Sequence, residues 1–140
     1  MAPAKTVAIV SLGCPKNLVD SENMAGLLSS AGYTLVDEDE AATILINTCG
    51  FVEQAKRESL LEIVKAVRRK AERPQLRIVV AGCLTQRYAQ TLSREFPEVD
   101  AFVGVFDETK IVDVLEEVTR GQRPVLAGPA PAFSGLLPRF

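Results

Sequence analysis

Short apolar runs alternate with longer amphipathic stretches along most of this 140-residue chain. Runs that are too short for globular helices and rich in β-branched and aliphatic residues predict buried strands. Five such strands are expected, at residues 6–12, 33–36, 43–48, 77–81 and 99–105. The stretches between them have helical spacing and predict four helices, at residues 17–31, 51–73, 85–96 and 109–120. Asn17 is expected to cap the first of these helices, with Asp20 three positions further on.

Strands that alternate with helices imply right-handed crossover connections and a parallel sheet. We therefore expect a doubly wound α/β fold of about five strands, with helices on both faces of the sheet. Residues 1–120 form the expected domain. The stretch 121–140 contains several Gly and Pro residues and no hydrophobic period, so it is expected to be a linker toward a further domain.

Composition narrows the class of protein. Apolar residues make up 47% of the chain and charged residues 24%, which is typical of soluble globular domains. The formal net charge of −2 lacks the basic surplus of nucleic-acid binders, so we expect no direct nucleic-acid contact from this domain. No apolar run approaches the roughly 18 residues of a membrane span, and the first ten residues do not resemble a signal peptide. The sequence thus predicts a cytoplasmic protein without membrane contact.

All three cysteines of the chain follow expected strands: Cys14 in "SLGCPKN", Cys49 in "NTCG" and Cys83 in "AGC". If the strands take the common order 2-1-3-4-5, the three strands that precede these cysteines are neighbours. Their carboxyl ends then meet at one edge of the sheet, with about 4.8 Å between adjacent strands. Three thiols at this edge could share a metal cluster or a redox site.

The residue types narrow the choice of metal. The chain contains no histidine, so a closed four-ligand zinc site and a Cys-His nucleophilic pair are both incomplete within it. Soft thiolates otherwise favour iron–sulfur clusters, and three protein ligands on a cubane leave one iron open for chemistry. The alternative for any single cysteine is a small buried hydrophobic residue, but three cysteines at equivalent strand ends fit a shared site better.

Polar residues beside the cysteines have two interpretations. They could cap helices and form hydrogen bonds within the loops, or they could form hydrogen bonds that orient the ligands of a metal. The residues concerned are Lys16, Asn17, Asp20, Asn47, Gln86, Arg87 and Tyr88.

Four segments together resemble the N-terminal domain of the radical-SAM methylthiotransferases. These are "SLGCPKNLVDSE", "ILINTCGFVEQAKRES", "AGCLTQRY" and "FPEVDAFVG", and the resemblance covers about residues 5–118. The Cys-Pro-Lys-Asn form is similar to the branch that modifies an aspartate of the twelfth small-subunit ribosomal protein. Relatives that act on tRNA usually carry Gly-Cys-Gln-Met-Asn at this place.

The resemblance implies both a cofactor and a reaction. Cys14, Cys49 and Cys83 would each give a thiolate to an auxiliary 4Fe-4S cluster, whose open iron would hold the sulfur species that is methylated and transferred. The reaction would replace a C–H bond on the aspartate β-carbon by C–SCH3. One S-adenosylmethionine would supply the methyl group, and a second would supply a deoxyadenosyl radical.

The sequence departs from the full family pattern in one respect. The radical step needs a second 4Fe-4S cluster on a Cys-x-x-x-Cys-x-x-Cys motif, which this chain lacks, as it lacks a C-terminal RNA-binding-like domain. We therefore expect a sulfur-carrying module that is inactive in the radical step by itself. Two alternatives stay open: the corresponding domain of a tRNA methylthiotransferase, and a non-catalytic α/β module whose cysteines serve thiol redox chemistry.

Overall fold

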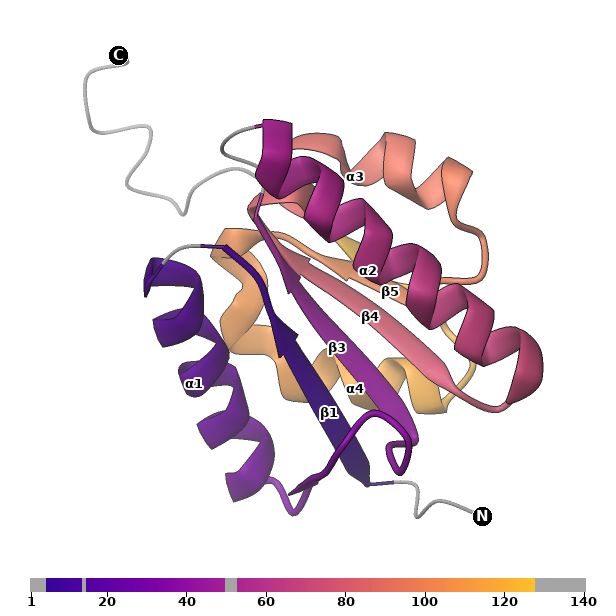
Figure 1. The fold of residues 1–140 in the computed structure, drawn as a ribbon. Coiled ribbons are helices and arrows are strands. Elements are labelled where there is room, and N and C mark those ends of the chain that lie inside the picture. The colour runs from indigo at the N-terminus through magenta and orange to yellow at the C-terminus, as the bar shows by residue number, and fades with distance from the viewer. Residues whose placement is uncertain (1–4, 14, 50–52, 128–140) are drawn as a thin grey trace.

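The computed structural model describes residues 5–13, 15–49 and 53–127, without the side chains of residues 15 and 16. Within these residues, strands and helices alternate, and Figure 1 shows helices on both faces of a single sheet. The strands are β1 (Thr6–Ser11), β2 (Thr34–Leu35), β3 (Thr43–Thr48), β4 (Arg77–Gly82), β5 (Ala101–Val103) and β6 (Val125–Leu126). The helices are α1 (Pro15–Ser30), α2 (Glu53–Glu72), α3 (Cys83–Glu95) and α4 (Ile111–Thr119), with a 3-10 helix, η1 (Val105–Lys110), before α4.

The sheet is parallel throughout and has the order β2-β1-β3-β4-β5-β6. This confirms the doubly wound α/β fold and the expected order of the first five strands. The sheet has six strands rather than about five, because β6 adds to β5 within the stretch expected to be a linker. A strand of two residues is too short to show an alternating pattern in the sequence.

The hydrophobic core lies on the two faces of the sheet. On one face, Met24 and Leu28 of α1 pack with Ile111 and Val114 of α4 in a buried cluster. On the other face, Ile63 of α2 and Leu92 of α3 belong to a second buried cluster, together with Ile46 of β3 and Val80 of β4. Because helices cover both faces, β3 and β4 are buried along nearly their whole length, and they form the rigid centre of the domain.

Several expected boundaries differ from the structure. α1 begins at Pro15, a residue favoured at the first helical position, so Asn17 lies inside the helix and the prediction that it caps α1 is wrong. α3 begins at Cys83, two residues before its expected start. η1 was not expected, and it occupies the last residue of the expected strand, the connection after it and the first two residues of the expected last helix, so that α4 begins at Ile111 rather than at residue 109. The expected start of the second helix, at Phe51, lies outside the described residues.

No helix in the described part of the chain is long and apolar enough to cross a membrane.

Candidate metal centre at the carboxyl edge of the sheet

The register of the sheet brings the expected cysteine positions to one level. Ser11 of β1, Asn47 of β3 and Ala81 of β4 form a single row of partners across three adjacent strands. Cys49 and Cys83 each lie two residues beyond this row, and the chain position of Cys14 lies three residues beyond it. The three cysteine positions therefore come two or three residues after aligned strand ends.

Two of the three predicted ligands belong to the described residues. Cys49 is 4% exposed and Cys83 is half-buried, and both are thiols rather than halves of a disulfide. Cys14 lies outside the described residues. Among the residues that are described, no three His, Cys, Asp or Glu side chains gather as a possible metal site. The sharing of one metal by three cysteines therefore stays a prediction.

Gly13 lies against Cys49. Its φ of +89° is in the region that favours glycine. A Cβ at position 13 would stand 2.4 Å from Cβ of Cys49 and 2.7 Å from its Sγ, so no side chain fits. The residue bonded to Cys14 is therefore in direct contact with Cys49.

Gly82 performs the same role on the other side of β3. With φ 99° and ψ −163°, it has a backbone conformation that is essentially restricted to glycine. A Cβ there would lie 2.4 Å from the carbonyl oxygen of Thr48 and 2.6 Å from Oδ1 of Asn47. Gly82 also precedes the first residue of α3, Cys83, so this thiol lies at a helix N-terminus, where the helix dipole favours a thiolate.

A buried polar network, which we call the amide network, connects α1 to the ends of β1 and β3. It consists of Ser11, Asn17, Ser21 and Asn47. The Asn17 amide donates to the carbonyl oxygens of Leu12, Asn47 and Thr48, at 2.6, 3.1 and 2.9 Å. The Asn47 amide donates in return to the Asn17 carbonyl oxygen, at 2.9 Å, and to Ser21 Oγ, at 2.9 Å. Ser21 Oγ in turn donates to Ser11 Oγ.

The backbone of Cys49 is held from α2. Its N–H donates to Ser59 Oγ at 3.0 Å, and the Ser59 hydroxyl donates to the Cys49 carbonyl oxygen at 2.9 Å. Ser59 is fully buried. A helix on one face of the sheet therefore fixes the loop after β3, and α1 on the other face fixes the loop after β1.

The remaining predicted neighbours lie on α3. Gln86 Nε2 donates to the carbonyl oxygen of Ala127 at 3.4 Å and so connects α3 to the residue after β6. Tyr88 interrupts α3 with φ −128° and ψ 25°. The Lys56 ammonium and the Arg87 guanidinium each lie 5.6 Å from the centroid of the Tyr88 ring. These residues stabilise the surroundings of Cys83 and do not gather into a separate site.

The sequence pattern indicates the cysteines, Asn17 and Asn47 as candidate site residues, but it does not indicate Ser59 or the partners of Asn17. Asn17 orients loops through buried carbonyl oxygens instead of capping α1. Ser59 is not among the candidate residues of the sequence analysis, although a serine at a buried helix position is itself a signal of a specific hydrogen bond. A Gly-Cys pair occurs at positions 13–14 and 82–83. In each pair the glycine marks a close approach to β3 or the residue after it: Gly13 to Cys49, and Gly82 to Thr48 and Asn47. The side chain of Lys16 lies outside the described part of the structure.

The described residues fit a thiolate-bound cluster. Cys49 and Cys83 follow adjacent strands in register, and the helix N-terminus at Cys83 suits an anionic ligand. The loop after β1 approaches Cys49 so closely at Gly13 that a side chain at position 13 would overlap the Cys49 side chain. What the arrangement can do chemically is to present soft ligands at one edge of a rigid sheet.

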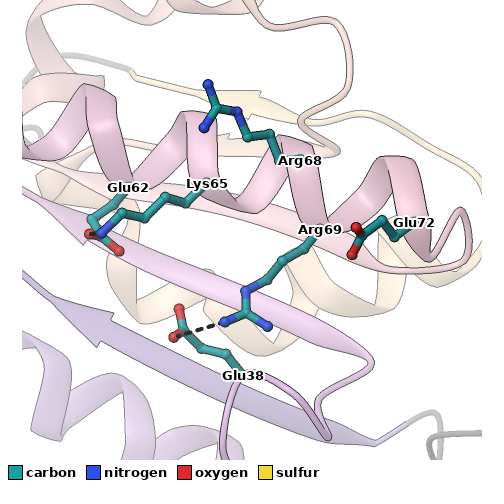
Figure 2. A pocket seen from close by; sticks show the side chains of 6 residues that line it. All are labelled: Glu38, Glu62, Lys65, Arg68, Arg69 and Glu72. Atoms are coloured by element: carbon teal, nitrogen blue, oxygen red, sulfur yellow. Dashed lines mark hydrogen bonds and ion pairs between the residues drawn. The ribbon is translucent and has the colours of Figure 1, made fainter.

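A charged cavity of about 420 Å³ lies elsewhere, along the C-terminal half of α2. Figure 2 shows Glu38 reaching from the loop before β3 toward Arg69 of α2. Its lining has three cations and three anions: Lys65, Arg68, Arg69, Glu38, Glu62 and Glu72. Because these charges are equal in number, and Lys65 pairs with Glu62 and Arg69 with Glu38, we assign this cavity no ligand.

Comparison with known proteins places the chain in a family. Residues 6–104 match the family described as "Uncharacterized protein family UPF0004". This range contains all three cysteines and the whole of β1 to β5.

Several curated relatives are named "Ribosomal protein uS12 methylthiotransferase RimO". The relative from Bdellovibrio bacteriovorus is 47% identical over 123 residues, which are 87% of this chain and 27% of the relative. The relative from Desulforudis audaxviator is 43% identical over 140 residues, 99% of this chain and 31% of its own length. That from Acetivibrio thermocellus is 49% identical over 114 residues, 81% of this chain and 25% of its own. The chain thus spans less than a third of each of these relatives.

Proposed function

Since this chain belongs to the family UPF0004, we propose that it is the N-terminal domain of a methylthiotransferase that modifies the ribosomal protein uS12. The relatives at 43–49% identity that carry this name support the assignment. The proposed reaction is methylthiolation of an aspartate of that protein, in the cytoplasm, where ribosomes lie. We regard this domain as the part that carries sulfur.

Cys14, Cys49 and Cys83 would hold an auxiliary 4Fe-4S cluster, each through one thiolate. When bound, such a cluster supplies an open iron site for the sulfur that is methylated and transferred. The residues of this chain bind and orient: Ser59 fixes the Cys49 backbone, and the N-terminus of α3 favours negative charge on Cys83.

One observation carries the proposal. β3 and β4 are paired so that Thr48 faces Gly82, and Cys49 and Cys83 are the residues that follow these two strand ends. On the other side of β3, Gly13 touches Cys49. Two described cysteines and the residue before the third therefore meet at the same edge of the sheet.

We assign the binding of S-adenosylmethionine and of the second 4Fe-4S cluster to a part of the full-length protein other than these 140 residues. The reason is that the Cys-x-x-x-Cys-x-x-Cys motif does not occur in this sequence. We therefore expect the present chain to produce no 5′-deoxyadenosine from S-adenosylmethionine when it is alone, under reducing and anaerobic conditions.

A domain exchange tests the function. The 27% of the Bdellovibrio relative that this chain matches is replaced by this chain, and the chimera is supplied with uS12 or with tRNA. We expect the mass of a methylthio group on uS12, and no such mass in chimeras with Cys14→Ala, Cys49→Ala or Cys83→Ala. The matched control is Thr6→Val, at the opposite edge of the sheet, which should retain the modification.

The same experiment separates the alternatives. Modification of tRNA but not of uS12 would replace the proposed substrate and leave the cluster site intact. Full modification of uS12 by all three cysteine variants would contradict the ligand assignment. A disulfide that forms reversibly between two of the cysteines, together with no uptake of iron, would favour the thiol redox module.

A further inference from the structure

Asn47 lies where the three strand ends that precede the cysteines meet. Its amide nitrogen donates to the carbonyl oxygen of Asn17 and to Oγ of Ser21, both in α1 and both at 2.9 Å. Its amide oxygen faces the opposite way, toward Gly82 of β4, where a Cβ would stand 2.6 Å from it. One side chain therefore spans from the helix after the first cysteine to the residue before the third.

The amide oxygen of Asn47 is an exception to the rule that buried polar atoms are hydrogen-bonded. The residue is 0% exposed, and Oδ1 accepts no hydrogen bond from the described residues. Such an oxygen is unfavourable in a protein interior. Instead of a hydrogen bond, this oxygen has a contact with Gly82. The α-hydrogen of Gly82 points toward it from the position that a side chain would occupy. An interior chosen for stability alone would place an apolar side chain here.

The contacts of Asn17 complete the connection. Its amide donates to the carbonyl oxygen of Thr48, the residue before Cys49, and to that of Leu12, two residues before Cys14. Since Asn17 and Asn47 each donate to the other's carbonyl oxygen, α1 cannot slide along β3 without the loss of several buried bonds at once. These bonds hold the ends of β1 and β3 to α1, and the close approach of Asn47 Oδ1 to Gly82 joins the end of β4 to them.

We propose that Asn47, together with Asn17, is a positioning residue that holds the three strand ends at one spacing, so that Cys14, Cys49 and Cys83 bind a single centre jointly. This inference rests on the proposed function for the sharing of one centre by the three thiols, but not for the identity of that centre as a 4Fe-4S cluster. Residues that orient metal ligands typically change metal affinity by about 10 to 100-fold when they are lost.

Arsenous acid is a probe of this positioning that needs neither iron nor enzyme activity. Its three hydroxyl groups leave as water when three thiols form As–S bonds, and arsenic stays trivalent, so no oxidant or reductant is required. The wild-type chain should bind one arsenic and protect three thiols from a thiol reagent. Asn47→Ala should bind arsenic at least about ten-fold more weakly.

The control variant is Thr6→Val, at the amino end of β1. Thr6 is buried, and its hydroxyl accepts a hydrogen bond from the Ala42 N–H at 3.0 Å. Thr6→Val therefore removes a buried hydrogen bond far from the cysteines, and its arsenic affinity should stay within about two-fold of wild type. A urea unfolding curve for each variant shows that the chains compared are folded.

A milder variant keeps the test decisive if Asn47→Ala does not fold. Ser21→Ala removes one of the two acceptors of the Asn47 amide and leaves Asn47 in place. Its arsenic affinity should lie between those of wild type and Asn47→Ala, about three-fold below wild type.

The outcomes separate this inference from the proposed function. If Asn47→Ala and Ser21→Ala bind arsenic through three thiols as tightly as Thr6→Val, Asn47 does not position the cysteines. If the wild-type chain protects fewer than three thiols, the loops do not act jointly and the inference fails. If the wild-type chain binds arsenic through three thiols but takes up no iron and sulfide, the inference holds and the cluster assignment fails.

Discussion

The two edges of the sheet are held by different chemistry. At the amino edge, long cationic side chains reach across the surface: Arg73 donates to three carbonyl oxygens of the loop before β3, and Arg123 donates to three in and after α3. At the carboxyl edge, the described loops are held by buried neutral groups, chiefly Asn17, Asn47 and Ser59.

The difference follows from what each edge has to hold. A solvated cation at the amino edge can exchange protein carbonyl oxygens for water, so its loss costs little. A buried amide cannot replace a lost protein partner by water, so the fold itself must supply each of its hydrogen-bond partners. Neutral amides that already bind carbonyl oxygens also leave neighbouring thiols available to a metal. The carboxyl edge is therefore built for fixed spacing and the amino edge for closure of loops.

The largest expected effect is at Gly82. Gly82→Ala would place a methyl group 2.4 Å from the Thr48 carbonyl oxygen, in a backbone conformation restricted to glycine. Strain and overpacking together should lower the free energy of unfolding by about 3 kcal/mol or more. Urea unfolding followed by circular dichroism measures this change.

Gly121→Ala is the matched variant at the amino edge. Gly121 also has a positive φ, of +86°, but nothing lies within 4 Å of the position of a Cβ. It should lose only the backbone term, about 1 to 2 kcal/mol. Equal losses in Gly82→Ala and Gly121→Ala would show that crowding against β3 is unimportant.

The next effect is expected at Ser59. Ser59→Ala leaves the buried N–H of Cys49 without its acceptor, which should cost about 1 to 3 kcal/mol. The Cys49 amide should also exchange its hydrogen faster, while amides of β6 at the far side of the sheet change little. Unchanged exchange at Cys49 would contradict the claim that α2 fixes this loop.

These residues show what the sequence could and could not predict. The strand order and the shared level of Cys49 and Cys83 follow from alternating apolar runs, because parallel strands with helical crossovers have few arrangements. The role of Asn17 could not be predicted, because its partners are carbonyl oxygens 30 and 31 residues away as well as one nearby. β6 was missed for a similar reason: it depends on pairing with β5 rather than on its own pattern.

Removal of an amino-edge contact should have a smaller effect. Arg73→Ala frees three carbonyl oxygens to bind water, so we expect a loss of roughly 1 kcal/mol in unfolding free energy. Arsenic binding by the cysteines should stay at the wild-type level. A loss of arsenic affinity as large as that expected for Asn47→Ala would remove the distinction between the two edges.

The smallest effect is a dependence on pH at the same edge. The hydrogen bond from Arg69, followed by its charge, holds the pKa of Asp39 below the ordinary value for the carboxyl group. Because the folded-state pKa is lowered, the stabilisation is present above the ordinary carboxyl pKa and is lost as pH falls through the lowered value. Asp39→Asn should therefore differ slightly from wild type in urea midpoint at neutral pH and not in acid. Added salt should reduce this difference, since Asp39 is exposed.

The count of iron and sulfide per chain after anaerobic reconstitution tests the central claim most directly. The account predicts about four irons and four sulfides in the wild-type chain, and loss of stable binding in Cys14→Ala, Cys49→Ala and Cys83→Ala, with full retention in Arg73→Ala. A variant that lacks all three cysteines and still holds the full complement of iron would contradict it.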